Sequence, residues 1–188
     1  MTLFERLDGF VTPKYKRVQR SKSSYDATAK RVYSELDRLV QDYKANAKSD
    51  LQVARLIRDD VDNQLRRYHQ YCIKEKIGAH YVEVGATVTD FEHMIPASRI
   101  RDLLLLGRIT TFEACNPPTC KLSREKHMML KDNGWASDTP DLIDFWQRYR
   151  LCFTTQGRFE THDGTPVDTE TWTLDKHYAY YADLLTTN

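Results

Sequence analysis

The sequence has no hydrophobic run near the roughly 20 residues that a membrane-spanning helix needs. Its first six residues have neither the basic stretch nor the apolar stretch of a secretory signal peptide. It has only 4 cysteines in 188 residues, too few for the disulfide framework of a small secreted domain. No internal repeat or low-complexity tract is present. These absences predict an intracellular, cytoplasmic protein with reduced thiols and no membrane partner.

Charge is nearly balanced over the whole chain, with 28 Lys and Arg against 27 Asp and Glu. It is unevenly distributed, because residues 1–80 carry 17 basic and 11 acidic side chains, whereas residues 134–188 carry 4 and 9. Phosphate backbones attract basic surfaces through counterion release, which favours the first part of the chain as a nucleic-acid face. The alternative is that this charge gradient is incidental and has no bearing on function.

Residues 11–22 contain five basic side chains and no acidic one, without a clear helix or strand period. We interpret residues 1–23 as a flexible basic arm that lies along DNA, and a solvated tail is the alternative. The predicted DNA-contacting residues are Lys14, Lys16, Arg17, Arg20 and Lys22.

Residues 24–78 have the pattern of two amphipathic helices, with apolar side chains every three or four positions in both halves. Between them, Ser49 and Gln52 form a capping-box pattern, and Gly78 is typical of a helix end. Two helices joined in this way predict an antiparallel hairpin. The histidine in the second helix, His69, is expected to lie on the surface or to pack between helices.

After this hairpin the pattern changes to short β-prone runs, and the fold class predicted for the whole chain is α+β. Two elements are expected from specific signals: a helix that starts at Thr139-Pro140-Asp141, and a hairpin turn at Asp163-Gly164. A last helix follows. The other predicted elements are strands over residues 81–84 and 88–95, a helix over 98–107, a strand over 110–114, a loop at 116–119 and a helix from Ser123 to about Leu130.

The residues that suggest chemistry lie between the second β-prone run and the helix that begins at Ser123. Glu92 and His93 are adjacent in that run, and His127 falls in the first turns of the helix. Neighbouring strand side chains point to opposite faces, so Glu92 and His93 are expected to aim apart. A histidine suits activation of a water molecule, and a carboxylate with a second histidine suits a divalent cation. Each residue alone is more often structural, and the signal lies in their order and spacing.

The segment Glu92-His93-Met94-Ile95-Pro96, followed by Asn116 and by Leu122-Ser123-Arg124-Glu125-Lys126-His127, resembles the HNH, or ββα-metal, nuclease family. That family has an acid–histidine pair at a strand end, then an asparagine, then a helix with a metal ligand. The resemblance covers about residues 80–132. The gap before the asparagine is longer than in compact members, and the paired Cys-x-x-Cys knuckles of many members are missing.

The resemblance implies a hydrolase: an endonuclease that cleaves DNA phosphodiester bonds. It implies a ββα-metal core at residues 79–133, after the helical hairpin of residues 24–78. Residues 134–188 would form a helix–β-hairpin–helix extension packed on that core. A homing enzyme encoded by a phage or mobile element would fit this description, and the residues leave open whether it is a monomer or a homodimer.

The same resemblance implies roles for individual residues. His93 would be the general base, and Asn116 would hold the loop and orient that base. Glu92 and His127 would be metal ligands, with Asp90 as a rival carboxylate on the same strand face. Such a ligand set suits Mg²⁺ or Mn²⁺.

Two other interpretations fit the same residues. Cys115, Cys120, His93 and His127 are the right types for a structural zinc site. The protein could instead bind nucleic acid without chemistry, through the basic arm and the arginines of the second helix.

Overall fold

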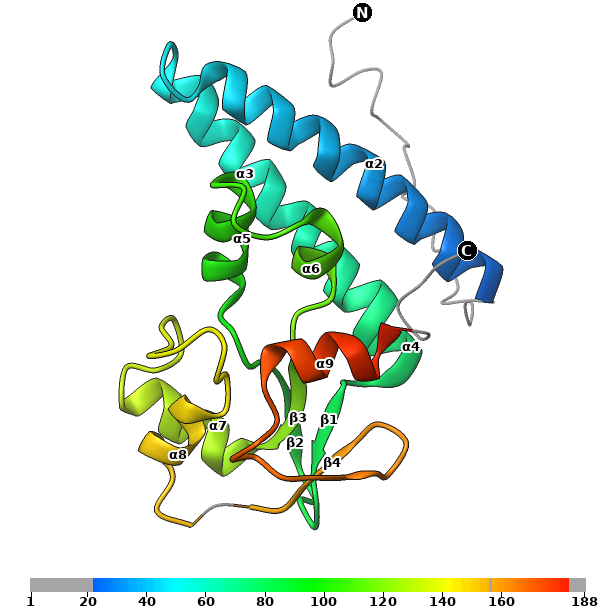
Figure 1. Cartoon of the computed structure of the whole chain (residues 1–188), viewed down its shortest axis with the longest axis vertical. Helices are drawn as coiled ribbons and strands as arrows, with labels where there is room; N and C mark the ends of the chain where they lie inside the picture. Colours follow the sequence, from blue (N-terminus) through cyan, green and yellow to red (C-terminus); the bar gives the residue numbers. More distant parts are fainter. Residues whose placement is uncertain (1–21, 156, 183–188) are drawn as a thin grey trace, which may run out of the picture.

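The computed structural model describes residues 22–155 and 157–182, including the side chains from residue 25 onward. The fold is mixed α+β (Figure 1), which confirms the predicted class. Lys14, Lys16, Arg17 and Arg20 of the predicted arm lie outside the described residues, as does the side chain of Lys22. The elements are α2 (Lys22–Asn46), α3 (Leu51–Tyr68), the π-helix η1 (His69–Lys74), α4 (Glu75–Ile77), β1 (Tyr81–Glu83), β2 (Thr89–His93), α5 (Ala97–Leu105), α6 (Thr111–Cys115), β3 (Thr119–Ser123), α7 (Arg124–Asp132), α8 (Gln147–Cys152), β4 (Phe159–Thr161), β5 (Pro166–Val167) and α9 (Leu174–Tyr180).

Helices α2 and α3 form the antiparallel hairpin that the periodicity predicts, and α5 and α6 lie beneath it (Figure 1). Their shared stripe of apolar side chains is buried because the residues recur at helical spacing. The cap of α3 differs by one position from the prediction, because Asp50 rather than Ser49 accepts from the N–H groups of Gln52 and Val53. The buried stripe consists of Ala29, Val32, Leu36, Leu39, Val40, Ala54, Val61, Leu65 and Tyr68.

The sheet has the strand order β2-β3-β1-β4-β5, so β2 is an edge strand. Strands β2 and β3 pair antiparallel over five residue pairs, from Thr89–Ser123 to His93–Thr119. Strand β1 runs parallel to β3 and antiparallel to β4. Because α7 starts directly after β3, the order of β2, β3 and α7 is strand, strand, helix.

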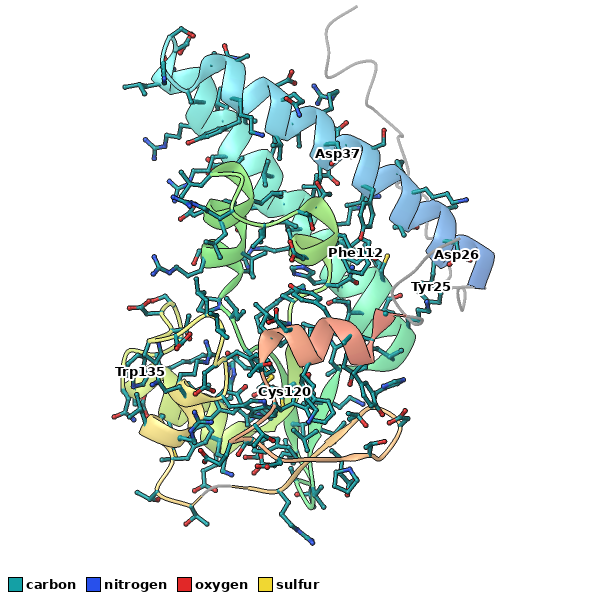
Figure 2. All side chains as sticks on the ribbon, viewed as in Figure 1. Tyr25, Asp26, Asp37, Phe112, Cys120 and Trp135 are labelled. Atoms are coloured by element: carbon teal, nitrogen blue, oxygen red, sulfur yellow. The ribbon has the colours of Figure 1, made fainter. Side chains whose placement is uncertain are left out.

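The predicted strand over residues 110–114 is wrong, because this segment is helix α6. Thr110 and Glu113 form a reciprocal capping box, in which each side chain bonds to the other residue's backbone N–H. The hydroxyl of Thr111 donates to Asp37 of α2, which fixes α6 against the hairpin. Figure 2 labels Phe112, the next residue of α6. The true partner of β2 is therefore β3, which follows α6.

The predicted helix start at residue 139 is also wrong, because α8 begins only at Gln147. The Asp141 side chain accepts from the backbone N–H groups of Ile143 and Asp144, which makes a local turn instead of a first helical turn. The hairpin turn at Asp163-Gly164 is confirmed between β4 and β5. None of the helices in the described ranges is long and apolar enough to cross a membrane.

The last helix, α9, is held to the sheet by a buried chain of hydrogen bonds. The indole N–H of Trp172 donates to the Tyr81 hydroxyl, which contacts His177 Nδ1 at 2.7 Å. His177 Nε2 contacts the backbone carbonyl of Asn116 at 3.1 Å. A carbonyl only accepts, so Nε2 carries the imidazole proton and Tyr81 donates to Nδ1. The C-terminal segment therefore fixes the connection between α6 and β3.

Candidate functional site

Glu92 and His93 leave the end of edge strand β2 in different directions, as the alternation of strand side chains predicts. Glu92 faces α7 and α8, where its carboxylate contacts His127 Nδ1 at 2.9 Å and the guanidinium of Arg148. His93 faces the π-helix η1, where its Nε2 lies 2.9 Å from His69 Nδ1. Two groups with different partners are thus presented side by side at one strand end.

His127 Nδ1 is buried and, despite its 2.9 Å contact with Glu92 Oε2, has no hydrogen-bond partner of suitable geometry among the described residues. The two atoms come from β2 and from the helix that follows β3. A lone imidazole nitrogen next to a carboxylate oxygen is a donor set that divalent cations accept. The side chains of His127 and Glu92 are 18% and 10% exposed, although Nδ1 itself is buried.

Arg148 is fully buried, and its Nη2 donates to Glu92 Oε1 and to the backbone carbonyl of His93. A buried guanidinium needs a buried anion, because desolvation of an unpaired charge costs several kcal/mol, and Glu92 is that anion. Nε and Nη1 of Arg148 have no hydrogen-bond partner in the described part of the chain. Arg148 therefore fixes both the Glu92 carboxylate and the backbone of the strand end.

His93 also lies near Phe91 and Lys74. Its ring lies 5.2 Å from that of Phe91, and Lys74 of η1 lies 5.5 Å above the Phe91 ring. Arg66 of α3 is close enough to lower the pKa of His93. The main cause of the lowered pKa is burial, which disfavours the charged imidazolium and keeps His93 neutral at pH 7.

Asn116 and Asp90 lie apart from this arrangement. The Asn116 amide donates to the carbonyl of Phe112 and to the hydroxyl of Tyr33, so it secures the end of α6. Asp90 forms an exposed pair with Arg124 at 3.4 Å. The side chain that contacts the His93 ring nitrogen is His69, not Asn116.

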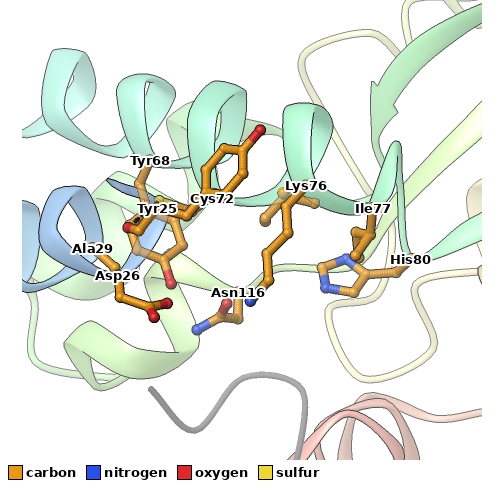
Figure 3. A pocket seen from close by; sticks show the side chains of 10 residues that line it. Tyr25, Asp26, Ala29, Tyr68, Cys72, Lys76, Ile77, His80 and Asn116 are labelled. Atoms are coloured by element: carbon orange, nitrogen blue, oxygen red, sulfur yellow. Dashed lines mark hydrogen bonds between the residues drawn. The ribbon is translucent and has the colours of Figure 1, made fainter. Parts of the chain in front are cut away.

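Asn116 also lines a small, partly open cavity between α2, η1 and the loop (Figure 3). In that view the end of the Lys76 side chain lies just above Asn116, with Tyr25 on one side and His80 on the other. The cavity volume is about 20 Å³, room for about one water molecule. It is too small for a substrate.

The four residues of the alternative zinc site do not form a metal-binding cluster. No group of three or more His, Cys, Asp and Glu side chains converges in residues 22–155 and 157–182. Cys115 ends α6, and Cys120 lies in β3 among the packed side chains of the sheet (Figure 2). Burial raises the pKa of both thiols well above the usual value. The structural zinc interpretation is therefore wrong.

Two residues of this site were not identified from the sequence. His69 was expected as a surface or packing residue, but only 1% of it is exposed and it reaches a residue 24 positions away. Arg148 lies 56 positions from Glu92, between the apolar residues Trp146 and Tyr149. A basic residue at the margin of an apolar stripe is usually solvated, so no local signal marks it.

Comparison of the chain with family models, with curated proteins and with solved structures finds no match. The arrangement of residues is thus the basis for a functional proposal.

Proposed function

We propose that the protein is a metal-dependent endonuclease of the HNH type that hydrolyses DNA phosphodiester bonds. The observation that carries this proposal is that Glu92 and His93, adjacent at the end of β2, face different partners. Glu92 meets His127 of α7 on one side, and His93 emerges next to it on the other. Strand β2 is followed, after α5 and α6, by its antiparallel partner β3 and by helix α7, which supports the ββα-metal resemblance.

Glu92 and His127 fit a small divalent cation by their spacing. Ligands at right angles around Mg²⁺, at about 2.0–2.1 Å from the ion, lie about 2.9 Å apart. Glu92 Oε2 and His127 Nδ1 are 2.9 Å apart and are not aligned as a hydrogen bond. Mg²⁺ commonly takes only one or two protein ligands and completes its shell with water and substrate phosphate. The cation would neutralise charge on the phosphate and assist the departing oxygen.

His93 would act on the water that attacks phosphorus. The water oxygen forms the new bond to phosphorus while its proton passes to His93. The bond from phosphorus to the 3′ oxygen breaks, and that oxygen takes a proton from solvent. Because β2 is an edge strand, a DNA backbone laid along its free side could meet both His93 and the Glu92–His127 pair. Lys74, which lies above the neighbouring Phe91 ring, favours an anionic substrate, whereas Arg66 is paired with Asp62.

The test is cleavage of supercoiled plasmid with Mg²⁺ or Mn²⁺, with loss on chelation. His93→Ala should reduce the rate by about 10²-fold or more. His162→Ala, in the turn between β4 and β5, is the matched control and should cut like the parent. If His93→Ala cuts as well as the parent, or the parent binds DNA without cutting it, the protein is a binding module.

A Mn²⁺ titration tests the ligands independently of cleavage. His127→Ala and Glu92→Gln should each weaken binding by about 10-fold or more, whereas Asp90→Asn should bind like the parent. Weaker binding by Asp90→Asn alone would make Asp90 the carboxylate ligand. Since Glu92→Gln also removes the partner of Arg148, its thermal unfolding must be compared with that of His127→Ala.

A further inference from the structure

His69 lies in a part of the chain outside the HNH-like segment, at the first residue of the π-helix η1. Its predecessor Tyr68, the last residue of α3, is also buried. Adjacent residues of an α-helix are about 100° apart, so the two do not share one narrow buried stripe. Short π-helical segments are rare and concentrate at functional sites. Here the segment begins at the residue whose ring is directed to the end of β2.

His69 makes two polar contacts and is almost completely buried, with 1% exposed. Its Nε2 lies 3.0 Å from the backbone carbonyl of Ala114, and its Nδ1 lies 2.9 Å from His93 Nε2. The rings of the two histidines have centroids 4.8 Å apart. The carbonyl of Ala114, the His69 ring and the His93 ring therefore form a continuous chain of hydrogen bonds.

The carbonyl of Ala114 at the end of this chain determines which nitrogen donates and which accepts in each hydrogen bond. A carbonyl oxygen only accepts, so His69 Nε2 must carry a proton. A neutral imidazole has one N–H, which leaves Nδ1 as an acceptor and requires His93 Nε2 to be the donor. Burial lowers the pKa of His69 to about 4, so its ring is neutral at pH 7.

We propose that His69 is the positioning residue for His93: it holds the His93 ring with its proton on Nε2 and leaves Nδ1 as the nitrogen that accepts a proton from water. This inference deepens the proposed nuclease function and rests on it. In the sequence-based scheme, Asn116 had this task. The Asn116 side chain instead bonds to Phe112 and Tyr33.

The arrangement also fixes which nitrogen faces the substrate. Nε2 of His93 is engaged with His69, and the backbone carbonyl of His93 accepts from Arg148. Two separate contacts, one on the ring and one on the main chain, thus set the orientation of this residue. A histidine with a fixed tautomer presents its lone pair without a reorganisation step before proton transfer.

The contact itself is tested by NMR on protein labelled with ¹⁵N in histidine. An N–H···N hydrogen bond between His93 and His69 should give a ¹⁵N–¹⁵N coupling across the bond. The His93 nitrogens should show the shifts of protonated Nε2 and unprotonated Nδ1. Absence of the coupling together with a protonated His93 Nδ1 would overturn the proposal, whether or not the protein cuts DNA.

Two substitutions separate the two contacts of His69. The carbonyl oxygen of Asn lies where Nδ1 lies in histidine, so His69→Asn keeps an acceptor for His93 and loses the donor to Ala114. The amide of Gln reaches the place of Nε2, so His69→Gln keeps the donor to Ala114 and loses the acceptor for His93. The pair is matched because each variant keeps one hydrogen bond and loses the other.

In plasmid cleavage, His69→Gln should lower kcat by about 10²-fold with KM changed less than about 3-fold. His69→Asn should lower kcat by less than about 5-fold and keep the His93 tautomer. Equal losses in both variants would show that His69 acts only through packing, and would overturn the positioning role. If the parent does not cleave DNA but the coupling is present, the nuclease function and the catalytic role of the His69–His93 pair are overturned. The hydrogen bond between the two histidines would still be established.

Discussion

Acidification from pH 7.5 to pH 5 should destabilise the fold through histidines that are buried in the neutral form. Burial lowers the pKa of His69 to about 4 and the pKa of His177 to about 3, against 6.5 for an ordinary histidine. The unfolded chain therefore binds protons that the folded chain does not. The contribution of these neutral histidines to the free energy of unfolding is fully present well above pH 6.5. It is lost progressively as the pH falls from 6.5 toward the folded-state pKa. Each histidine costs about 1.4 kcal/mol per pH unit in this window, or about 2 kcal/mol at pH 5.

Both histidines together would remove about 4 kcal/mol, a large part of the 5–15 kcal/mol typical of a domain. The assay is urea unfolding at several pH values between 5 and 7.5, above the range in which most carboxylates titrate. His177→Gln keeps a donor for the carbonyl of Asn116 and removes one titrating group. Its free energy of unfolding should depend on pH less steeply than the parent's, by about 1.4 kcal/mol per pH unit. Parallel pH curves for parent and variant would refute the reasoning.

Three further substitutions test the packing around the site. Arg148→Met should lower the free energy of unfolding by about 3–5 kcal/mol in urea titrations, because the Glu92 carboxylate stays buried without its cation; addition of Glu92→Gln should recover part of the loss. Tyr81→Phe should cost about 1–3 kcal/mol, because two buried ring nitrogens lose their shared hydroxyl partner, and a loss below about 0.5 kcal/mol would contradict this hydrogen-bond chain. Gly78→Ala should cost about 1–3 kcal/mol in thermal unfolding, because its φ of +81° strains any residue with a Cβ; an unchanged midpoint would exclude this strain.

The elements predicted correctly from the sequence are those with a long periodic signal. The α2–α3 hairpin has one apolar stripe along both helices, and no local alternative competes with it. Segment 110–114 was misassigned because its threonines and Phe112 favour strands. Its Thr110 and Glu113 carry the capping-box spacing that decides for a helix. At residue 139 a helix start was predicted, but Asp141 closes a local turn that competes with the first helical turn.

In the candidate site, too, the residues with a local sequence signal could be predicted, and those placed only by packing between distant elements could not. Glu92 and His127 could be placed together from sequence because strand alternation and a helix directly after the partner strand determine their directions. Their role as metal ligands stays a prediction. His69 and Arg148 could not be found, because their positions depend on how α3 and α8 pack against the sheet. A buried polar contact between distant elements leaves no periodic trace in either segment.

The short connection between α6 and β3 links these distant contributions. His69 of η1 contacts the carbonyl of Ala114, and His177 of α9 contacts the carbonyl of Asn116, so two buried imidazoles hold the main chain on either side of Cys115. Three residues after Asn116, Thr119 pairs with His93 in the sheet. The hairpin and the C-terminal segment therefore act on the same few residues that set the position of the β2 end. An edge strand has backbone pairing on one side only. At the end of β2, the imidazole of His69 from η1 and the guanidinium of Arg148 from α8 supply the contacts that a second strand partner would otherwise make.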